Sequence, residues 1–366
     1  MKVIITTGIY PPDIGGPATY IPQIALDLVE KGHQVSIITL GARDEYTAES
    51  RISIKKIKRS QFLIFRILKT ILVIRKELNI NDSVFSNGLF LETAIALRFT
   101  RRKKLRQSVV KIVGDPVWER LRNQGKTDLS LTEFTSKELT GTSLILRKIY
   151  NWVWSMFNVR TSPSAELCNF VESNCSGISC LHIPNGVEIT DLKNTVPEFE
   201  LVTVSRLVNW KNIDIAIRVA AKLDLSILII GDGPELQNLQ ELAKELKAKA
   251  HFTGHLSSAE TKNLMSKAKL FLQISDYEGL SFSLLEAMNF GLAPIVSNVP
   301  GNTAVISNMK TGLVVEINEE SLERAINTLL SDSDLLAKIS RNAHNEARAK
   351  YDGKIQRNKV IELITK

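Results

Sequence analysis

Two carboxylates stand eight residues apart in a segment that joins an expected strand to an expected helix, with Glu278 in the loop and Glu286 in the helix. A carboxylate only accepts hydrogen bonds, and its two oxygens can bind two neighbouring hydroxyl groups at once. Taken singly, Glu278 could be a solvated loop charge and Glu286 an acid that favours the helix dipole. The pattern as a whole instead indicates a ligand with hydroxyl groups at both ends and phosphates between them.

Backbone N–H groups at the start of this helix form the second part of the pattern. Free N–H groups at a helix N-terminus face anions, and the helix dipole attracts negative charge. The residues predicted to contact the ligand in this way are Gly279, Leu280, Ser281 and Phe282. Phosphates bound to them would lie between the two acids.

Two cations, Arg206 and Lys211, follow an expected strand at 201–204 and precede an expected helix at 213–223. When a nucleoside diphosphate departs, negative charge grows on its leaving phosphate, and fixed cations stabilise that charge more as it develops. Arginine offers a planar fork for two oxygens, and lysine offers a mobile point charge. As plain surface cations the two would oppose the dipole of the next helix, so their placement favours a bound anion.

Glycines follow expected strands at two further places. Gly15 and Gly16 come after the strand at 2–7, and Gly231 opens a Gly-Asp-Gly-Pro turn after the strand at 225–230. Glycine lets the backbone approach a ligand closely and tolerates a positive φ. An ordinary turn between a strand and a helix would also explain them, so their predicted role in ligand binding depends on the other motifs.

The chain is long enough for two domains, and strands and helices alternate twice along it. This alternation predicts two doubly wound α/β domains with parallel sheets, which bind ligands at the carboxyl ends of their strands. A polar stretch at 188–200 is the expected linker. The expected strands are 2–7, 34–40, 83–86, 108–113, 158–161, 180–183, 201–204, 225–230, 250–254, 270–274, 293–297 and 313–315, and the expected helices include 18–31, 62–78, 213–223, 235–247 and 335–350.

The segment 275–288 resembles the E-x7-E signature of the family 4 retaining glycosyltransferases, the glycosyl transferases group 1. Four more segments match that family's motifs in the family's order: Tyr10–Gly16, Pro184–Val187, Ser205–Asn212 and Gly231–Pro234. The resemblance implies the GT-B fold, in which two Rossmann-like domains face each other across a cleft. Residues 1–190 would bind the acceptor, residues 191–350 would bind the nucleotide sugar, and a final helix at 351–366 would pack back on the first domain.

The resemblance also implies a role for each motif. In that family the first acid contacts hydroxyl groups of the donor sugar and the second contacts the ribose, which gives these roles to Glu278 and Glu286. Arg206 and Lys211 would hold the donor diphosphate. The implied reaction transfers a hexose from a UDP- or GDP-sugar to a glycan or lipid-linked acceptor, with no further cofactor. Retention is explained in this family by front-side attack, in which the leaving phosphate takes the acceptor proton, so Glu278 is not assigned as a base.

Two departures from the family pattern leave roles open. Many members carry a histidine near the reacting carbon, whereas the matching stretch 111–120 has none. Asp115 is the candidate to orient an acceptor hydroxyl or sugar in its place, and a turn aspartate before proline is the alternative. The stretch 300–304 lacks an acid that the family often has, so donor preference stays open. A non-catalytic nucleotide-sugar-binding module and a GT-B nucleotide-sugar epimerase are the alternative functions, and the intact acids and cations argue against both.

No metal site is expected from the sequence. His251 and His255 lie across a strand end and Gly254 rather than on one helical face. Asp332 opens an Asp-Ser-Asp string before the helix at 335–350, where we expect it to cap the helix. The 3 cysteines lack paired spacing, and neither a secretory signal nor a membrane-spanning run is present, so we expect a reduced cytoplasmic protein.

Positive charge is concentrated in the first half of the chain. Residues 1–190 carry 26 Lys and Arg against 17 Asp and Glu, whereas residues 191–366 carry 21 against 22. Five cations lie in 51–59, six lie in 98–106, and an aromatic stretch lies at 152–157. These features predict contact with an anionic membrane surface, at the inner face of the cell membrane, with a solvated basic surface and a buried helix as the alternative. Nucleic acid is not expected, because no recognised binding module is present.

Overall fold

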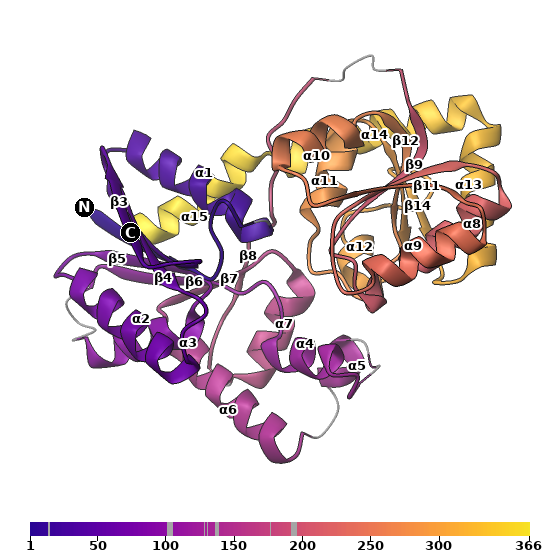
Figure 1. The fold of residues 1–366 in the computed structure, drawn as a ribbon. Coiled ribbons are helices and arrows are strands. Elements are labelled where there is room, and N and C mark those ends of the chain that lie inside the picture. Colours follow the sequence, from indigo (N-terminus) through magenta and orange to yellow (C-terminus); the bar gives the residue numbers. More distant parts are fainter. Residues whose placement is uncertain are drawn as a thin grey trace. The chain divides into compact units, whose positions relative to one another are not determined.

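A computed structural model describes residues 1–13, 15–100, 105–127, 129, 131–135, 139–175, 177–191 and 196–366 of the chain. The chain forms two compact units (Figure 1). The N-terminal unit comprises Met1–Pro184 together with Gln356–Lys366, and the C-terminal unit comprises Asn185–Ile355. The last residues of the chain therefore belong to the same unit as the first.

The N-terminal unit is built on one sheet, which has eight strands among the residues described. Their order is β3-β4-β2-β1-β5-β6-β7-β8, and each neighbouring pair is parallel except β3 with β4. The strands are β1 (Lys2–Thr7), β2 (Gln34–Gly41), β3 (Glu45–Glu49), β4 (Ile52–Lys58), β5 (Ser83–Asn87), β6 (Gln107–Lys111), β7 (Val159–Ser162) and β8 (Leu181–His182). All but β3 and β4 were predicted from the sequence.

The antiparallel edge formed by β3 and β4 was missed because its residues alternate poorly. In β4 the adjacent pair Lys55-Lys56 interrupts the run of isoleucines, and Ile57 is its one buried residue. Lys55 and Lys56 belong to the predicted cationic stretch 51–59, and they form ion pairs with Glu77 and Glu45. Part of the predicted basic surface is therefore neutralised within the unit.

Helices complete the N-terminal unit, and strands β1, β2 and β5 are buried along nearly their whole length. The helices are α1 (Gly16–Glu30), α2 (Leu63–Glu77), α3 (Phe90–Phe99), α4 (Pro116–Asn123), α5 (Leu131–Thr135), α6 (Gly141–Ser155), α7 (Ala165–Asn174) and α15 (Gly353–Thr365). Helix α15 is held to α1 by the Arg357 guanidinium, which donates to Asp27 at 2.5 Å and to Gln23 at 3.0 Å. No helix in the described part of the chain combines the length and apolar content that a membrane span requires.

The C-terminal unit is built on a parallel sheet with six strands among the described residues, in the order β11-β10-β9-β12-β13-β14. The strands are β9 (Phe199–Val204), β10 (Ser226–Ile230), β11 (Lys249–Gly254), β12 (Ala268–Gln273), β13 (Ala293–Ser297) and β14 (Leu313–Val315), and all were predicted. Chain order reverses between the adjacent strands β9 and β12. In open α/β sheets ligands bind outside the carboxyl ends of the strands at such a switch point.

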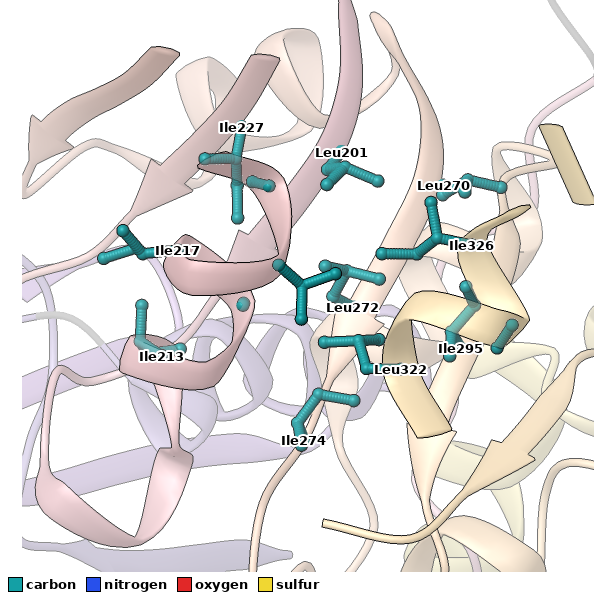
Figure 2. Packing of buried hydrophobic residues seen from close by; sticks show 14 of the residues in the cluster. Leu201, Ile213, Ile217, Ile227, Leu270, Leu272, Ile274, Ile295, Leu322 and Ile326 are labelled. Carbon is teal, nitrogen blue, oxygen red and sulfur yellow. The ribbon is translucent and has the colours of Figure 1, made fainter. Parts of the chain in front are cut away.

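Apolar side chains cover both faces of this second sheet. Alternate residues point to opposite faces of a strand, so Leu201 and Val202 of β9 enter two different buried clusters. Figure 2 shows one cluster, in which Leu201, Ile227 and Leu270 of the strands pack together with Ile217 and Ile326 of two covering helices. The helices are α8 (Ile213–Lys222), α9 (Leu236–Glu245), α10 (Ser258–Met265), α11 (Phe282–Asn289), α12 (Pro300–Thr303), α13 (Glu319–Ser331) and α14 (Ser333–Lys350). Burial on both faces explains why inner strands such as β10 and β13 are nearly continuous apolar runs in the sequence.

Candidate functional site

The two loops that leave β9 and β12 at the switch point carry the two predicted diphosphate cations and the first predicted acid. Arg206 and Lys211 follow β9, and Glu278 follows β12. Asn212 joins the loops, because its side-chain amide donates to the Ile274 carbonyl at 2.9 Å and to Asp276 at 2.6 Å. The sheet order therefore brings together motifs that are far apart in the sequence.

Lys211 and Glu278 are in direct contact within this site. Lys211 Nζ lies 2.5 Å from Glu278 Oε1, and the Ser275 hydroxyl donates to the same oxygen at 2.7 Å. The Lys211 and Glu278 side chains are 17% and 11% exposed, so the pair is largely shielded from water. The sequence predicts that the two residues bind different parts of a ligand, and it does not predict their contact.

Arg206 differs from Lys211 in its surroundings. Its side chain is exposed, and it makes neither an ion pair nor a side-chain hydrogen bond with any other residue that the structure describes. An exposed guanidinium keeps its planar set of donors available for an external anion.

Glycines allow the loops of this site to approach one another. Gly231 has a φ of 145°, and a Cβ on it would lie 1.9 Å from the Ser205 carbonyl oxygen. A Cβ on Gly301 would lie 1.9 Å from the Glu278 carbonyl oxygen. Gly301, Asn212 and Ser275 were not singled out in the sequence, although Asn212 and Ser275 lie within segments that match the family motifs.

The start of α11 has the form expected of an anion-binding helix terminus. The Ser281 hydroxyl caps the helix by accepting from the Leu284 N–H at 3.2 Å. Helix geometry leaves the N–H groups of Phe282 and Ser283 without partners inside the helix. The Leu280 carbonyl accepts from the Asn185 side chain at 2.9 Å, which fixes the preceding loop.

Glu286 lies on a separate hollow of the C-terminal unit. The hollow has a volume of about 280 Å³ and is lined by Glu188, Thr190, Asp191, Ala259, Lys262, Asn263, Ser266, Glu286, Asn289 and Phe290. Lys262 Nζ lies 3.5 Å from Glu286 Oε1. Burial nevertheless raises the pKa of Glu286, since a charged carboxylate loses hydration there.

Gly15 and Gly16 lie in the N-terminal unit, at the start of α1. Gly15 precedes the helix with a φ of 142°, and a Cβ on it would lie 2.9 Å from Ile9 Cδ1. This positive φ and close approach require glycine, as an ordinary turn before a helix also would.

Asp115 does not have the geometry expected of an acceptor-orienting residue. Its side chain is fully buried, and Arg147 Nη1 and Nη2 donate to Oδ1 and Oδ2 at 3.0 and 2.5 Å. Oδ1 also accepts from the Val117 N–H at 3.1 Å, so Asp115 caps α4. Because both oxygens are engaged inside the unit, the alternative of a turn aspartate describes the residue better.

Two buried ionisable groups flank Asp115 in the sequence and were not predicted. Burial lowers the pKa of Lys111 to about 7, and its Nζ lies 3.8 Å from the centroid of the Tyr20 ring. Burial, and next the charge of Asp115, raise the pKa of Glu119 to about 7. Both groups titrate near neutral pH.

Asp332, which was weighed as a metal ligand, has a structural role. Asp332 Oδ1 accepts from the N–H groups of Asp334 and Leu335 at 3.1 and 2.9 Å, so it caps α14 as predicted. Within the described ranges, no three or more His, Cys, Asp or Glu side chains gather in a way that could hold a metal ion. The three cysteines are free and buried.

Comparisons with known proteins agree with this fold. Residues 189–346 match the family model described as Glycosyl transferases group 1. This region of the chain is a domain of that group, and the resemblance found in the sequence is confirmed. Over 156 residues the chain is 30% identical to the alpha-D-kanosaminyltransferase of Streptomyces kanamyceticus, a match that spans 40% of either protein.

Two further comparisons extend over the whole chain. The chain is 24% identical over 374 residues to an uncharacterized glycosyltransferase of Methanocaldococcus jannaschii, with 96% of this chain and 94% of the relative covered. The structure of Anabaena HepE in complex with UDP and glucose is similar with a TM-score of 0.75 at 18% identity, covering 99% of this chain and 98% of HepE. The predicted fold class is thereby confirmed as GT-B, with two doubly wound Rossmann-like domains.

Proposed function

We propose that this chain is a retaining, metal-independent glycosyltransferase that moves a hexose-type sugar from a UDP- or GDP-sugar to a glycan or lipid-linked acceptor. The observation that carries the proposal is the 2.5 Å contact between Lys211 and Glu278 at the switch point of the C-terminal sheet. This contact puts a cation suited to phosphate beside an acid suited to sugar hydroxyl groups. The UDP and glucose bound to HepE agree with a UDP-sugar as the donor.

In the proposed reaction Arg206 and Lys211 hold the donor diphosphate. Their positive charges stabilise the leaving phosphate more strongly as its negative charge grows, which lowers the barrier. The Lys211 ammonium group donates a hydrogen bond to Glu278 and has further N–H donors for phosphate oxygens. The two cations supply positive charge at the leaving group, which supports a reaction without a metal ion.

Glu278 positions the sugar in this scheme. The Lys211 ammonium and the Ser275 hydroxyl both contact Oε1, which directs Oε2 to a sugar hydroxyl. The bond from the anomeric carbon to the phosphate oxygen breaks while the acceptor oxygen bonds on the same face. The leaving phosphate takes the acceptor proton. Glu286 binds the ribose at its own hollow, and the start of α11 faces the phosphates.

The remaining assignments follow the two units of the chain. Residues 1–190 bind the acceptor, with Gly15 and Gly16 near the donor. Residues 191–350 bind the donor, with Gly231 and Gly279 in the loops that contact it. Residues 351–366 pack on the first domain. The bonds of Arg357 to Asp27 and Gln23 support the last assignment. The basic first half supports a cytoplasmic protein that contacts an anionic surface of the inner membrane face.

A panel of UDP-, GDP- and ADP-sugars tests the donor assignment with the full chain. A ligand that binds the folded state raises the melting temperature, and Arg206→Ala and Lys211→Ala should each suppress that rise. Each substitution should also lower the rate of nucleoside diphosphate release by about 10²–10³-fold, with or without a metal chelator in the assay. The exposed Arg341→Ala and Lys338→Ala are matched controls with unchanged release.

The outcomes separate the alternatives. Unchanged release in both Arg206→Ala and Lys211→Ala would contradict the diphosphate assignment. A non-catalytic binding module would show the temperature rise without any release. An epimerase would convert the sugar of the intact donor without an acceptor. Activity that disappears in the chelator and returns with Mn²⁺ or Mg²⁺ would refute the metal-independent reaction.

A further inference from the structure

Helix α2 (Leu63–Glu77) of the N-terminal unit has an apolar face that the structure leaves open. Phe65 and Leu72 are 68% and 62% exposed, and Phe62, just before the helix, is 68% exposed. Leu68 and Ile64 are more than half exposed as well. Single exposed apolar residues are ordinary, whereas a contiguous patch marks an interaction surface.

The exposed residues form one stripe along the helix. Phe65, Leu68 and Leu72 are spaced by three and four residues, which places them on the same side of an α-helix. The opposite side packs into the unit through the buried residues Ile71 and Ile74. The helix is therefore apolar on two sides, and its packing within the unit accounts for only one of them.

Positive charge borders the stripe at its C-terminal end. Arg75 and Lys76 are exposed, and neither forms an ion pair with another residue in the described part of the chain. The surface continues onto the neighbouring helix α3, where Arg98 is exposed and Phe99 is 66% exposed (Figure 1). The Arg75 guanidinium lies 5.7 Å from the centroid of the Phe99 ring, which joins the two helices at this surface.

The surfaces predicted from the sequence are less suited to contact with a membrane. In the aromatic stretch 152–157, Trp154 and Phe157 are buried, so the predicted alternative of a core helix holds for them. In the stretch 51–59, Lys55 and Lys56 are engaged in ion pairs. In the stretch 98–106, residues 101–104 lie outside the described part of the chain. The sequence predicts a helix at 62–78, and the exposed stripe on it was not predicted.

We propose that the α2 stripe, with Phe99 and the cations Arg75, Lys76 and Arg98, docks the enzyme on an anionic lipid bilayer. Apolar side chains insert at the boundary between headgroups and acyl chains, and adjacent cations contact anionic headgroups. A second copy of this chain fits the surface less well. A two-fold contact through the same patch would bring the cations of both copies together.

The α2 stripe supplies the surface for the membrane partner named in the proposed function, and its binding to lipid does not depend on the transfer reaction. Binding to vesicles needs no donor sugar. A chain that released no nucleoside diphosphate could still bind lipid, and an active enzyme could still fail to bind it. The two proposals therefore succeed or fail in separate measurements.

The test uses the full chain and sedimentation with vesicles of phosphatidylcholine, with or without phosphatidylglycerol. The wild-type protein should bind the anionic vesicles more tightly, and the triple variant F65S/L68S/L72S should bind them about tenfold more weakly or worse. R75Q/K76Q should lose most of the preference for phosphatidylglycerol. The control L26S/Y46S/M309S removes exposed apolar residues elsewhere and should bind like the wild type.

Controls for folding, the binding to vesicles and the oligomeric state together decide whether a lipid bilayer or a second copy of the chain covers the stripe. Circular dichroism and the melting temperature should show that the variants remain folded, since all altered side chains are exposed. Wild-type binding by both F65S/L68S/L72S and R75Q/K76Q would overturn the proposal. Sedimentation velocity that shows a dimer lost in the triple variant, with vesicle binding unchanged, would assign the stripe to a second copy instead.

Discussion

Lys211 Nζ lies 2.5 Å from Oε1 of Glu278, although the two residues are 67 positions apart in the sequence. The β9 and β12 loops therefore share one shielded ion pair, and each residue fixes the geometry of the other. Removing one partner of such a pair leaves the other charge poorly compensated, which costs more than the pair itself contributes.

We expect a double-mutant cycle to detect this coupling. Lys211→Ala and Glu278→Ala should each lower the free energy of unfolding by about 1–3 kcal/mol, because each leaves a partly buried charge unpaired. The double variant should cost less than the sum of the two. Denaturant unfolding measures all three values, with the exposed Arg206→Ala as a variant of unchanged stability. Strictly additive losses would show that the two side chains do not interact.

Gly301→Ala should disturb the same site by displacing the backbone at Glu278. The new Cβ would lie 1.9 Å from the Glu278 carbonyl oxygen, and backbone on both sides must move to admit it. We expect a loss of about 1–3 kcal/mol in unfolding free energy and weaker binding of nucleotide sugars. Gly8→Ala is the control, because a Cβ there meets nothing within 4 Å. Equal melting temperatures for the two variants would refute this role of Gly301.

Asp115→Ala should lower the stability of the folded chain. It removes the partner of the buried Arg147 and the cap of α4, so we expect a loss of about 3–5 kcal/mol in unfolding free energy. The measurement is thermal and denaturant unfolding of the full chain. A variant with wild-type stability that has lost acceptor-dependent turnover would instead restore Asp115 as an acceptor-orienting residue.

Glu119 should make stability depend on pH. Burial raises its pKa to about 7 in the folded state, above the ordinary value of 4.5. The folded state therefore binds the proton more tightly, and the contribution of Glu119 to stability declines as pH rises from 4.5 to about 7. Lys111, whose pKa burial lowers to about 7, acts in the window above that pH.

Glu119→Gln should remove this decline. The difference in unfolding free energy between wild type and variant should shift by about 1–3 kcal/mol in favour of the variant across that window. Comparing the two proteins at each pH cancels the titration of other carboxylates. A constant difference from acid to neutral pH would show that Glu119 keeps an ordinary pKa.

The strands of the C-terminal unit were the most predictable part of the fold. All except the edge strand β11 are short runs rich in apolar residues that end near a glycine, proline or polar turn, so local pattern suffices to find them. The strands β3 and β4 escaped prediction because Lys55 and Lys56 break the alternation, and their charges are compensated by partners elsewhere in the chain. The candidate site was predictable as a list of motifs, but its contacts were not.

The sequence by itself determined the alternation of strands and helices, the glycine turns, and the residue types at Arg206, Lys211, Glu278 and Glu286. Only the tertiary structure decided that Lys211 contacts Glu278, that Arg147 forms an ion pair with Asp115, and that one side of α2 is exposed to solvent. The physical reason is range: periodicity and turn chemistry act over a few residues, whereas these contacts depend on strand order and on which helix faces become buried.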